Sequence, residues 1–478
     1  MSAATATELW RLSATELAEA IQTRQASSVE VVEAHLRRIE AVNPTINAVV
    51  LVLGEQALKA AEAADRALVS GAGLPPFHGV PFTIKDIIDV AGTPTTQGFK
   101  ALAEAYPSRD APIVERMKAA GAIPLGRTNL PSGAVRWHTD SELWGATINP
   151  WDRTRTPGAS SAGEAAAIAT GMSPMGLGSD GLGSLRHPAQ CCGIAVLKPT
   201  LGRIPHATAI EPEYAAIGMQ LTGVYGPLAR RVADLRTAFG VLAGPTWRDP
   251  WTVPAPLRGP ELAKPARVAL VVDPAGHGTA EQVQEGVRKA ATALQDAGYV
   301  VEELEPPSIE AAANALLVML STPGIRQGWN EFLAPVAPAE TRRFMSAFFE
   351  AAGYPDAMAA EASFMTRQSV LRAWGEFQHT HPLIVAPVCT EPPFEAGTDL
   401  NQGRVTETIG TMRMAMAVNA LGLPAVALPV GIGDGLPQAV QLIGPRYRED
   451  LCLDAAAAIE DRLGIITPID PHMGRADR

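Results

Sequence analysis

Three residues of this chain could form a hydrolytic site that needs no histidine. They are Lys85 in Pro-Phe-Thr-Ile-Lys-Asp, Ser160 in Pro-Gly-Ala-Ser-Ser-Ala-Gly and Ser184 in Gly-Leu-Gly-Ser-Leu-Arg-His-Pro. A serine hydroxyl is a weak nucleophile at neutral pH, so it needs a base within hydrogen-bond reach, and a neutral amine can be that base. Lys85 ends an apolar run, where burial would lower its pKa and keep part of it neutral. We therefore expect Ser160 to pass a proton between Ser184, the nucleophile, and Lys85.

The turn before Ser184 could stabilise the negative charge that this attack creates. Consecutive backbone N–H groups in a glycine-rich turn can converge on the oxyanion of a tetrahedral intermediate. The predicted donors are Gly181, Leu182 and Gly183. The alternative for Ser184 is a serine that only satisfies a tight turn.

The lysine and the first serine also have purely structural alternatives. Lys85 could form a buried ion pair with Asp86 or Asp89, because buried lysines are usually paired. Ser160 could cap the alanine-rich helix expected to begin near Gly163, although Ser161 is the better candidate for that cap.

Two further patterns indicate other chemistries. The run Gly176-Leu-Gly178-Ser-Asp-Gly181 satisfies the dinucleotide motif G-x-G-x-x-G, but that site lies between a strand and a helix start, and residues 183–188 are not expected to start a helix. A Ser–His–Asp triad would use one of three nearby histidines, but no G-x-S-x-G elbow surrounds either serine, so we expect these histidines to be structural. They are His78, His138 and His187.

The spacing of the three residues resembles that of the amidase signature family. Lys85 and Ser160 are 75 residues apart, and Ser160 and Ser184 are 24 residues apart. Residues 158–199 resemble the glycine- and serine-rich signature of that family throughout, and residues 110–129 and 422–445 resemble two of its other segments. Motif matches of this length carry a low risk of a false positive. The resemblance implies hydrolysis of a carboxylic amide through an acyl-enzyme.

The resemblance also implies roles for several other residues. The peptide bond before Ser160 would be cis, and Asp180 and Arg186 would hold the catalytic loop, although their types alone would equally fit a solvated ion pair. The segment after Asn129 would line the acyl pocket, with core packing as the alternative. Its candidate substrate contacts are Ala134, Val135 and Trp137.

The sequence departs from the family pattern where glycines are usual, at Ala159, Ala162 and Leu182. The departure in the oxyanion turn matters most. If position 182 requires a positive φ, leucine would be strained there by about 1 to 3 kcal/mol.

The elements expected around these residues alternate between helices and strands. Residues 1–70 read as helical, with capping boxes at Ser13-x-x-Glu16 and Ser27-x-x-Glu30. Residues 266–272 and 299–304 read as strands on either side of an amphipathic helix over 279–297. Such alternation predicts an α/β fold with a mixed sheet covered by helices on both faces. The resemblance implies a large, mostly parallel twisted sheet.

We expect one domain over residues 1–478, because no linker or charge run divides the chain. Within it, 1–70 form the N-terminal helical segment, 75–203 the catalytic core, and 310–380 a variable helical segment that could determine specificity. Part of that segment, 319–349, is rich in aromatic residues, as an apolar cleft would be. Aromatic residues at helical spacing are more often core.

Composition limits the partners. With 478 residues, 47% of them hydrophobic, the chain can bury a large core, and its net charge of −11 argues against a nucleic acid or an anionic membrane as the main partner. The four cysteines lack the spacing of a zinc site or a disulfide framework, and residues 1–10 do not read as a secretory signal, so we expect a cytoplasmic protein. The uncharged stretch 414–433 is interrupted by Gly and Pro and reads as a helix end followed by a buried strand.

Three functions are compatible with the sequence. The leading one is an independent amidase for a small aliphatic or aryl amide or an anilide, with no metal or other cofactor and with a homodimer left open. The second is the A subunit of a glutamyl-tRNA amidotransferase, which hydrolyses glutamine only within a complex; residues 132–137 differ from its usual acidic segment. The third is an inactive relative that acts as a binding protein, which only Leu182 supports.

Overall fold

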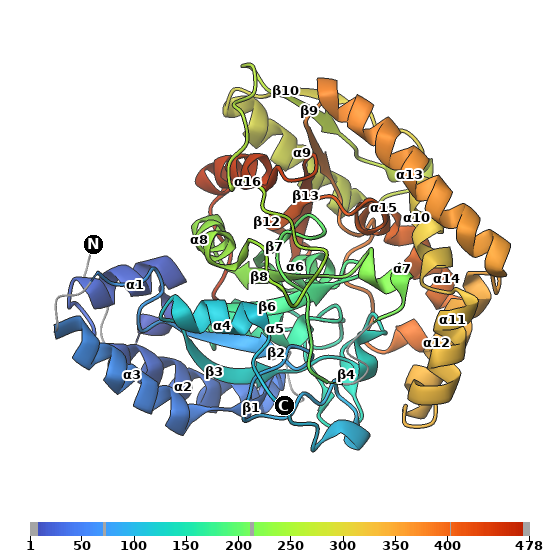
Figure 1. Cartoon of the computed structure of the whole chain (residues 1–478). Helices are drawn as coiled ribbons and strands as arrows, with labels where there is room; N and C mark the ends of the chain where they lie inside the picture. Colours follow the sequence, from blue (N-terminus) through green and yellow to red (C-terminus); the bar gives the residue numbers. More distant parts are fainter. Residues whose placement is uncertain (1–7, 70–72, 211–214, 402, 472–478) are drawn as a thin grey trace, which may run out of the picture.

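The computed structural model describes residues 8–69, 73–210, 215–401 and 403–471. Eleven strands form one sheet with the order β1-β3-β2-β6-β8-β7-β12-β13-β11-β9-β10 (Figure 1). The strands are β1 Val49–Val52, β2 Pro81–Lys85, β3 Ile123–Thr128, β6 Met175–Asp180, β7 Ala195–Lys198, β8 Val224–Ala229, β9 Arg267–Leu270, β10 Val300–Glu303, β11 Leu383–Ala386, β12 Ala425–Gly433 and β13 Leu436–Ile443. A separate hairpin pairs β4 Asp140–Ser141 with β5 Gly145–Ala146.

The sheet is mixed, as expected, but the expectation of a mostly parallel sheet is only approximate. Among the described strands, β2 is parallel to both β3 and β6, and β9 is parallel to both β10 and β11. The other neighbouring pairs, which include the central β6–β8, β8–β7 and β7–β12, are antiparallel. The parallel β2 and β6 matter for function, because parallel strands end at the same edge of a sheet.

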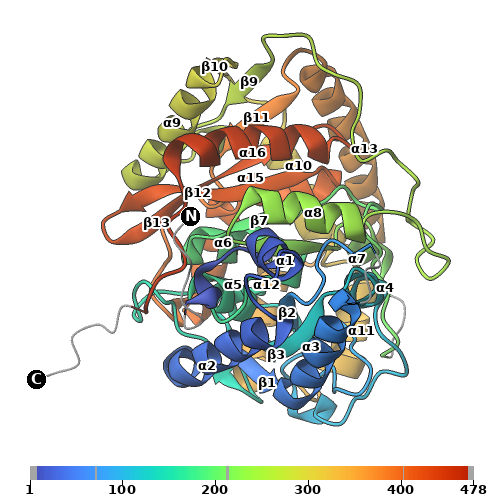
Figure 2. The same cartoon turned by 90° about the vertical axis from the view of Figure 1, so that its left-hand side faces the viewer.

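Helices cover both faces of the sheet (Figure 2). Along β7 and β12, Leu197 and Val426 belong to a core cluster that also contains residues of α8 and α16, whereas Val196 and Ala427 belong to a cluster with residues of α5 and α6. Successive side chains of a strand point to opposite faces, so these two clusters are the two layers of the core. A third cluster contains residues of the helices between residues 309 and 421. The described helices are α1 Ala14–Gln22, α2 Ser28–Ile46, α3 Gly54–Val69, α4 Pro112–Ala119, α5 Ala162–Ala169, α6 Arg186–Cys192, α7 Ile217–Gln220, α8 Val232–Leu242, α9 Glu281–Asp296, α10 Ile309–Met319, α11 Pro323–Gly328, α12 Ala339–Ala351, α13 Ala357–Thr380, α14 Arg404–Thr411, α15 Arg413–Leu421 and α16 Glu449–Leu463.

Short 3₁₀ segments and one π segment complete the described elements. The 3₁₀ segments are η1 Leu9–Arg11, η2 Lys100–Leu102, η3 Ser132–Ala134, η4 Pro274–Gly276 and η6 Thr398–Leu400, and η5 Trp329–Leu333 is the π segment.

The N-terminal segment is helical with one exception. Both capping boxes form, at Ser13 with Glu16 before α1 and at Ser27 with Glu30 before α2. The stretch Val49–Val52, however, is an edge strand that pairs antiparallel with β3. The prediction of an entirely helical segment is therefore wrong at β1, where pairing with a distant strand decides the structure.

The other predicted elements lie close to their expected bounds. Strand β9, helix α9 and strand β10 form the predicted unit, and residues 414–433 form nearly all of α15 followed by β12. Within the described part of the chain, no helix combines the length and the apolar character needed to cross a membrane. The single sheet contains strands from residue 49 to residue 443, and the single domain stays a prediction.

The variable segment is helical, as expected, and runs from α10 through α13 along one side of the molecule (Figure 1). Four of its aromatic side chains are core residues, as the packing alternative requires: Trp329, Phe344, Phe348 and Phe349. Phe332 differs, because 69% of it is exposed.

Candidate active site

Strand β2 places Lys85 at the parallel edge of the sheet. Phe82 and Ile84 belong to the core cluster on one face, so Thr83 and Lys85 point to the other face, toward α5. Lys85 is the last residue of β2, and its side chain is 0% exposed. Strand β6 runs parallel beside β2, with Ile84 opposite Leu177, and therefore ends at the same edge.

The amine of Lys85 lies among three serine hydroxyls. Its Nζ donates to Ser160 Oγ at 2.7 Å, Ser179 Oγ at 2.9 Å and Ser161 Oγ at 3.0 Å. The predicted pair of Lys85 and Ser160 is thus in direct contact. Ser179, the residue before Asp180 on β6, was not identified from the sequence, although the parallel strands could have indicated it.

The ion-pair alternative for Lys85 is wrong. Asp86 pairs with the buried guanidinium of Arg127, whose Nη2 lies 3.2 Å from Asp86 Oδ1. Asp89 instead accepts hydrogen bonds from Thr208 Oγ1 at 2.9 Å and from the N–H of Ala209 at 2.6 Å. Both aspartates therefore have partners of their own, and among the described residues the amine of Lys85 donates to neutral hydroxyls alone.

Burial lowers the pKa of Lys85 from 10.5 to about 7, against the opposing charges of Asp180 and Glu164. The removal of water disfavours the ammonium form, and three hydroxyl groups do not replace a counterion. An amine with a pKa near neutrality is available as a proton acceptor at the pH where a hydrolase works.

A buried carboxyl group, Glu164, adjoins the lysine and was not identified from the sequence. Thr83 Oγ1 donates to Glu164 Oε1, and Thr128 Oγ1 donates to Glu164 Oε2 at 2.6 Å. Burial raises the pKa of Glu164 from 4.5 to about 8 despite these hydrogen bonds. Gly176 on β6 makes room for the carboxyl group, because a Cβ there would lie 1.7 Å from Oε1.

The two adjacent serines, Ser160 and Ser161, precede α5, and the hydroxyls of both accept hydrogen bonds from Lys85. The peptide bond between Ala159 and Ser160 is cis, as the resemblance implied. Ser161 occupies the N-cap position of α5, as predicted, but its side chain caps no backbone N–H of the helix. Instead its hydroxyl accepts from Lys85 and lies 3.2 Å from the carbonyl oxygen of Ser179, to which it donates.

The carboxylate of Asp180 organises the loop that carries Ser184. It accepts from the N–H of Gly183 at 2.7 Å, from the N–H of Leu185 at 3.1 Å and from Nε of Arg186 at 3.0 Å. Asp180 and Arg186 are both 0% exposed, so they form a buried pair and not a solvated one. Their predicted role in holding the loop agrees with these contacts. Arg186 and its neighbours hold the pKa of Asp180 below its usual range.

Asn419 on α15 fixes the same loop from the other side and was also missed. Its Oδ1 accepts from the N–H of Gly183 at 3.2 Å and from Arg186, and its Nδ2 donates to the carbonyl oxygen of Asp180 at 3.2 Å. Asn419 is 236 residues from Gly183 in the chain. Only the folded chain brings the two together.

The oxyanion turn differs from the expectation in two respects. The positive φ of the turn falls on Gly183, at 90°, and Leu182 has no left-handed conformation, so the expected strain at leucine is absent. The N–H of Gly183 is already bonded to Asp180 and Asn419. The N–H groups of Gly181, Leu182 and Ser184 have no acceptor among the described residues. These three are the donors that remain for an oxyanion.

Ser184 itself lies next to the lysine site. Its carbonyl oxygen accepts from the N–H of Ser161 at 3.2 Å, and its side chain is partly exposed. Within the described chain the Ser184 hydroxyl makes no hydrogen bond, so the link between Ser160 and Ser184 is unformed. The structure thus brings Lys85, Ser160 and Ser184 to one place and leaves the Ser184 hydroxyl without a hydrogen-bond partner in the described chain.

Two of the three candidate substrate contacts, Val135 and Trp137, belong to or pack against one apolar cluster. Trp137 is 4% exposed and packs edge-on against Phe344, with ring centroids 5.2 Å apart, which fits the core alternative. Val135 and Leu182 are partly buried and lie against the same cluster, which also contains Met412. Ala134 is partly exposed and has a positive φ of 59°.

The two rejected motifs can be placed as well. Helix α6 begins at Arg186, so the prediction that no helix follows the glycine-rich run is wrong. Gly176 and Gly178 nevertheless lie inside β6 and not in the turn, so they cannot shape a loop around a pyrophosphate.

The three histidines contact other groups than the serines. His78 lies 3.0 Å from the carbonyl oxygen of Ala64, and His138 lies 3.2 Å from Thr156 Oγ1. His187 stacks on Phe394.

Comparisons with known proteins agree with this geometry. The sequence matches the model of the Amidase family over residues 30–453. It is 40% identical over 479 residues to an indoleacetamide hydrolase of Bradyrhizobium diazoefficiens, covering 96% of this chain and 88% of the relative. It is 33% identical over 483 residues to the A subunit of the glutamyl-tRNA(Gln) amidotransferase of Chloroflexus aurantiacus, covering 95% of this chain and 97% of that protein. The crystal structure of a bacterial aryl acylamidase of the amidase signature enzymes superimposes with a TM-score of 0.81 at 26% identity, covering 94% of this chain and 96% of that one.

Proposed function

Because the chain belongs to the amidase signature family and is an amide hydrolase, we propose that it cleaves its substrate through an acyl-enzyme on Ser184. The observation that carries this assignment is the 2.7 Å hydrogen bond between Lys85 Nζ and Ser160 Oγ in a fully buried setting. It joins a base of lowered pKa to a hydroxyl that can relay a proton.

In the proposed reaction, Ser184 Oγ attacks the carbonyl carbon of the amide. Its proton passes to Ser160, whose own proton passes to the neutral amine of Lys85. The oxyanion of the tetrahedral intermediate accepts from the N–H groups of Gly181, Leu182 and Ser184. The proton then returns through Ser160 to the leaving nitrogen, which departs as ammonia or an amine. Water repeats the sequence on the ester and releases the carboxylic acid.

We propose an aryl-substituted amide, of the arylacetamide type, as the substrate. Leu182 lies in the turn before Ser184, and Met412 lies beside Gly183. Both belong to an apolar region against which Val135 also packs, and this region favours a flat apolar acyl group over a polar one. The 40% identical relative is an indoleacetamide hydrolase, which supports the same class.

The substrate class can be tested with four amides and purified full-length protein. Ammonia release from indole-3-acetamide and phenylacetamide should exceed release from acetamide and from glutamine by at least about tenfold in kcat/KM, because each buried aryl ring adds apolar contact. Glutamine as the best substrate would favour the second candidate, the amidotransferase component, which the 33% identity to such a protein supports.

The nucleophile can be tested by covalent labelling. A fluorophosphonate should react with Ser184, and the Ser184→Ala variant should lose both the label and several orders of magnitude in kcat. A Ser161→Ala variant is the matched control, since this neighbouring serine touches Lys85 but is not the proposed nucleophile. A label on Ser160 would contradict the assigned roles.

We also propose a cytoplasmic location and leave the homodimer as a prediction. All four cysteines are buried and unpaired, which supports a reducing compartment. Light scattering of the purified protein would measure the oligomeric state.

A further inference from the structure

Two segments from other parts of the chain hold residues 154–158, which lead into Ser160. Residues 394–396 pair with this stretch in the antiparallel direction, through two backbone hydrogen bonds of 2.8 Å. A second segment contacts the stretch through Thr139, whose Oγ1 donates to the carbonyl oxygen of Gly158 at 2.9 Å. That carbonyl group lies two residues before Ser160 in the sequence. Both segments therefore act close to the serine that contacts Lys85.

The buried hydroxyl group of Thr156 links the second segment to the same stretch again. It donates to the carbonyl oxygen of Trp137 at 3.3 Å and lies 3.2 Å from His138 Nδ1. It also accepts from the N–H of Gly158 at 3.1 Å. Thr156 is 0% exposed, so water does not compete for these contacts.

The second segment is held in place by its side chains. Among the described residues, the backbone N–H groups of residues 136–138 have no acceptor. No helix or strand of the described chain includes them. The position of this loop therefore depends on what its side chains contact.

Arg136 provides a two-pronged contact from this loop. Its Nε donates to Asp399 Oδ2 at 3.1 Å, and its Nη2 donates to Asp399 Oδ1 at 2.9 Å. The two side chains are 2% and 0% exposed. A second carboxylate, that of Asp140, lies 3.8 Å from Arg136 Nη1 and is 43% exposed. A bidentate pair fixes the orientation of its partners as well as their distance.

The ion pair joins the two segments that hold the stretch before Ser160. Asp399 follows residues 394–396 by three positions, and Arg136 precedes Thr139 by three positions. Each segment is thus bonded to residues 154–158 and, through this pair, to the other segment. Apolar side chains of similar size would often stabilise a fold as well as a buried ion pair does, so a requirement for fixed geometry explains the pair better.

We propose that Arg136 and Asp399 are positioning residues, which keep Ser160 Oγ within reach of Lys85 and Ser184. This inference rests on the proposed role of Ser160 as the proton relay. Neither Arg136 nor Asp399 is bonded to the lysine or to the serines among the described residues, so they act through the backbone between them and Ser160. A displacement of about 1 Å at a reacting group can cost about 10² in rate.

The test is steady-state amide hydrolysis by the full-length protein with and without the ion pair. The variant Arg136→Met/Asp399→Leu leaves neither of the two charges buried alone, and a thermal melt verifies that it is folded. Its kcat should fall by about tenfold or more, while KM stays within about threefold of the wild type. An unchanged kcat in the folded variant would overturn the proposal.

The same change in a Ser160→Ala background shows whether the pair acts through the relay. Without the relay hydroxyl, loss of the ion pair should lower the residual kcat by less than about twofold. An equal loss in both backgrounds would mean that the pair acts by another route, and would overturn the proposal. A wild-type kcat in Ser160→Ala alone would instead overturn the proposed relay, and this inference with it.

A conservative variant tests the fork separately from the charge. Arg136→Lys keeps the positive charge but cannot form two parallel hydrogen bonds. It should lose part of kcat, about threefold, and only where Ser160 is present. A loss of the same size in Arg136→Lys and in Arg136→Lys/Ser160→Ala would overturn the proposal.

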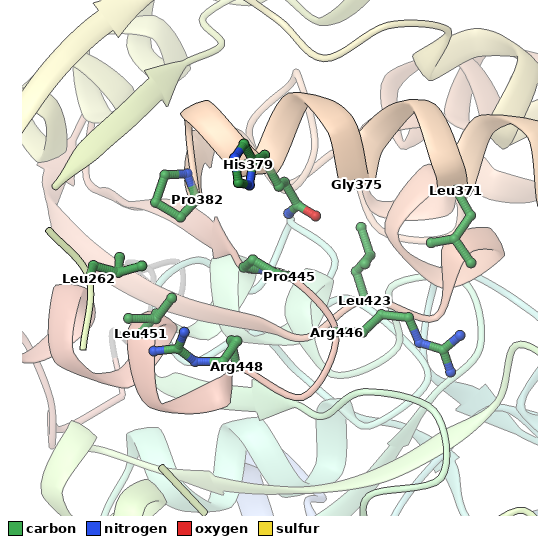
Figure 3. A pocket seen from close by; sticks show the side chains of 11 residues that line it. Leu262, Leu371, Gly375, His379, Pro382, Leu423, Pro445, Arg446, Arg448 and Leu451 are labelled. Atoms are coloured by element: carbon green, nitrogen blue, oxygen red, sulfur yellow. The ribbon is translucent and has the colours of Figure 1, made fainter. Parts of the chain in front are cut away.

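Another bidentate pair provides the matched control. Arg448 Nε and Nη2 donate to Asp450 Oδ1 at 2.9 Å and Oδ2 at 3.0 Å. Arg448 lines a cavity of about 480 Å³ between α13 and α16, and none of Lys85, Ser160 and Ser184 lines it (Figure 3). Arg448→Met/Asp450→Leu should therefore keep the wild-type kcat. A comparable loss in this control would attribute the effect to the removal of any such pair and overturn the proposal.

Discussion

The ionisation of Lys85 should control the pH dependence of amide hydrolysis. Burial lowers its pKa from 10.5 to about 7, so about half of the enzyme molecules hold a neutral amine at pH 7. With a pKa of 10.5, only about one molecule in 3000 would be neutral at that pH. We therefore expect kcat/KM to rise about tenfold per pH unit below this ionisation and to level off above it.

The neighbouring carboxyl group makes the prediction sharper. Burial raises the pKa of Glu164 to about 8, and we predict that Glu164 is protonated when Lys85 loses its proton. Glu164→Gln replaces a neutral carboxyl group with a neutral amide of the same shape. It should therefore leave the ionisation near pH 7 within about half a pH unit of the wild type. An ionised Glu164 would instead raise the pKa of Lys85. Removing that negative charge would then shift the rising part of the pH–rate profile to lower pH by more than about one unit.

Stability gives an independent readout of the same group. The folded pKa of Glu164 lies above the unfolded value of 4.5, so the folded protein binds the extra proton between pH 4.5 and about 8. The stability linked to that proton is lost as the pH rises through this window, at up to about 1.4 kcal/mol per pH unit. Glu164→Gln has no titrating group at this position and does not lose stability in this way. The unfolding free energy of Glu164→Gln minus that of the wild type should therefore increase with pH over the same window.

The assay is initial-rate ammonia release from a good amide substrate between pH 5 and pH 10, with urea unfolding of both proteins across the same range. Lys85→Ala should abolish the rise of kcat/KM with pH together with most of the rate. If kcat/KM of Lys85→Ala still rises with pH as in the wild type, the ionisation belongs to another group. If the difference in unfolding free energy between Glu164→Gln and the wild type does not change with pH, Glu164 is ionised.

Three further predictions concern the loop, its buried ion pair and metals. Leu182→Pro removes a proposed oxyanion donor and should lower kcat by about 10², whereas Leu182→Gly keeps the N–H and should keep the rate; equal rates in both variants would remove this N–H from the oxyanion site. Arg186→Met leaves Asp180 buried without its partner and should cost about 3 to 5 kcal/mol of unfolding free energy, against less than about 1 kcal/mol for the exposed control Arg37→Met; similar costs would show that the buried pair is not structural. Dialysis against a chelator should leave the activity unchanged, and activity that a divalent ion restores would contradict a metal-free mechanism.

The residues that sequence reasoning identified lie in local motifs. Lys85, Ser160 and Ser184 each lie in a short segment whose composition already indicates a strand end, a helix start or a tight turn. The capping boxes before α1 and α2 are equally local, because donor and acceptor are three residues apart. Features of this kind need no knowledge of the rest of the fold.

The partners that sequence reasoning missed are set by tertiary structure. Glu164 is bonded to threonines on two different strands, and Asn419 reaches the catalytic loop from a helix more than two hundred residues away. Strand orientation has the same origin, since pairing and not composition makes β6–β8 and β8–β7 antiparallel. The short edge strand β1 exists because β3 offers it a partner.

The catalytic turn shows how one long-range constraint reverses a local expectation. A Gly-Leu-Gly run does not reveal which of its residues takes the left-handed conformation. In the folded chain the carboxylate of Asp180 captures the N–H of Gly183 at 2.7 Å, and the positive φ falls on that glycine. Leu182 is thereby left with an ordinary backbone conformation, and its side chain packs against the apolar cluster that contains Trp137 and Met412. The turn before Ser184 therefore accommodates the leucine without a left-handed conformation at that residue, and the leucine side chain adds to this apolar cluster.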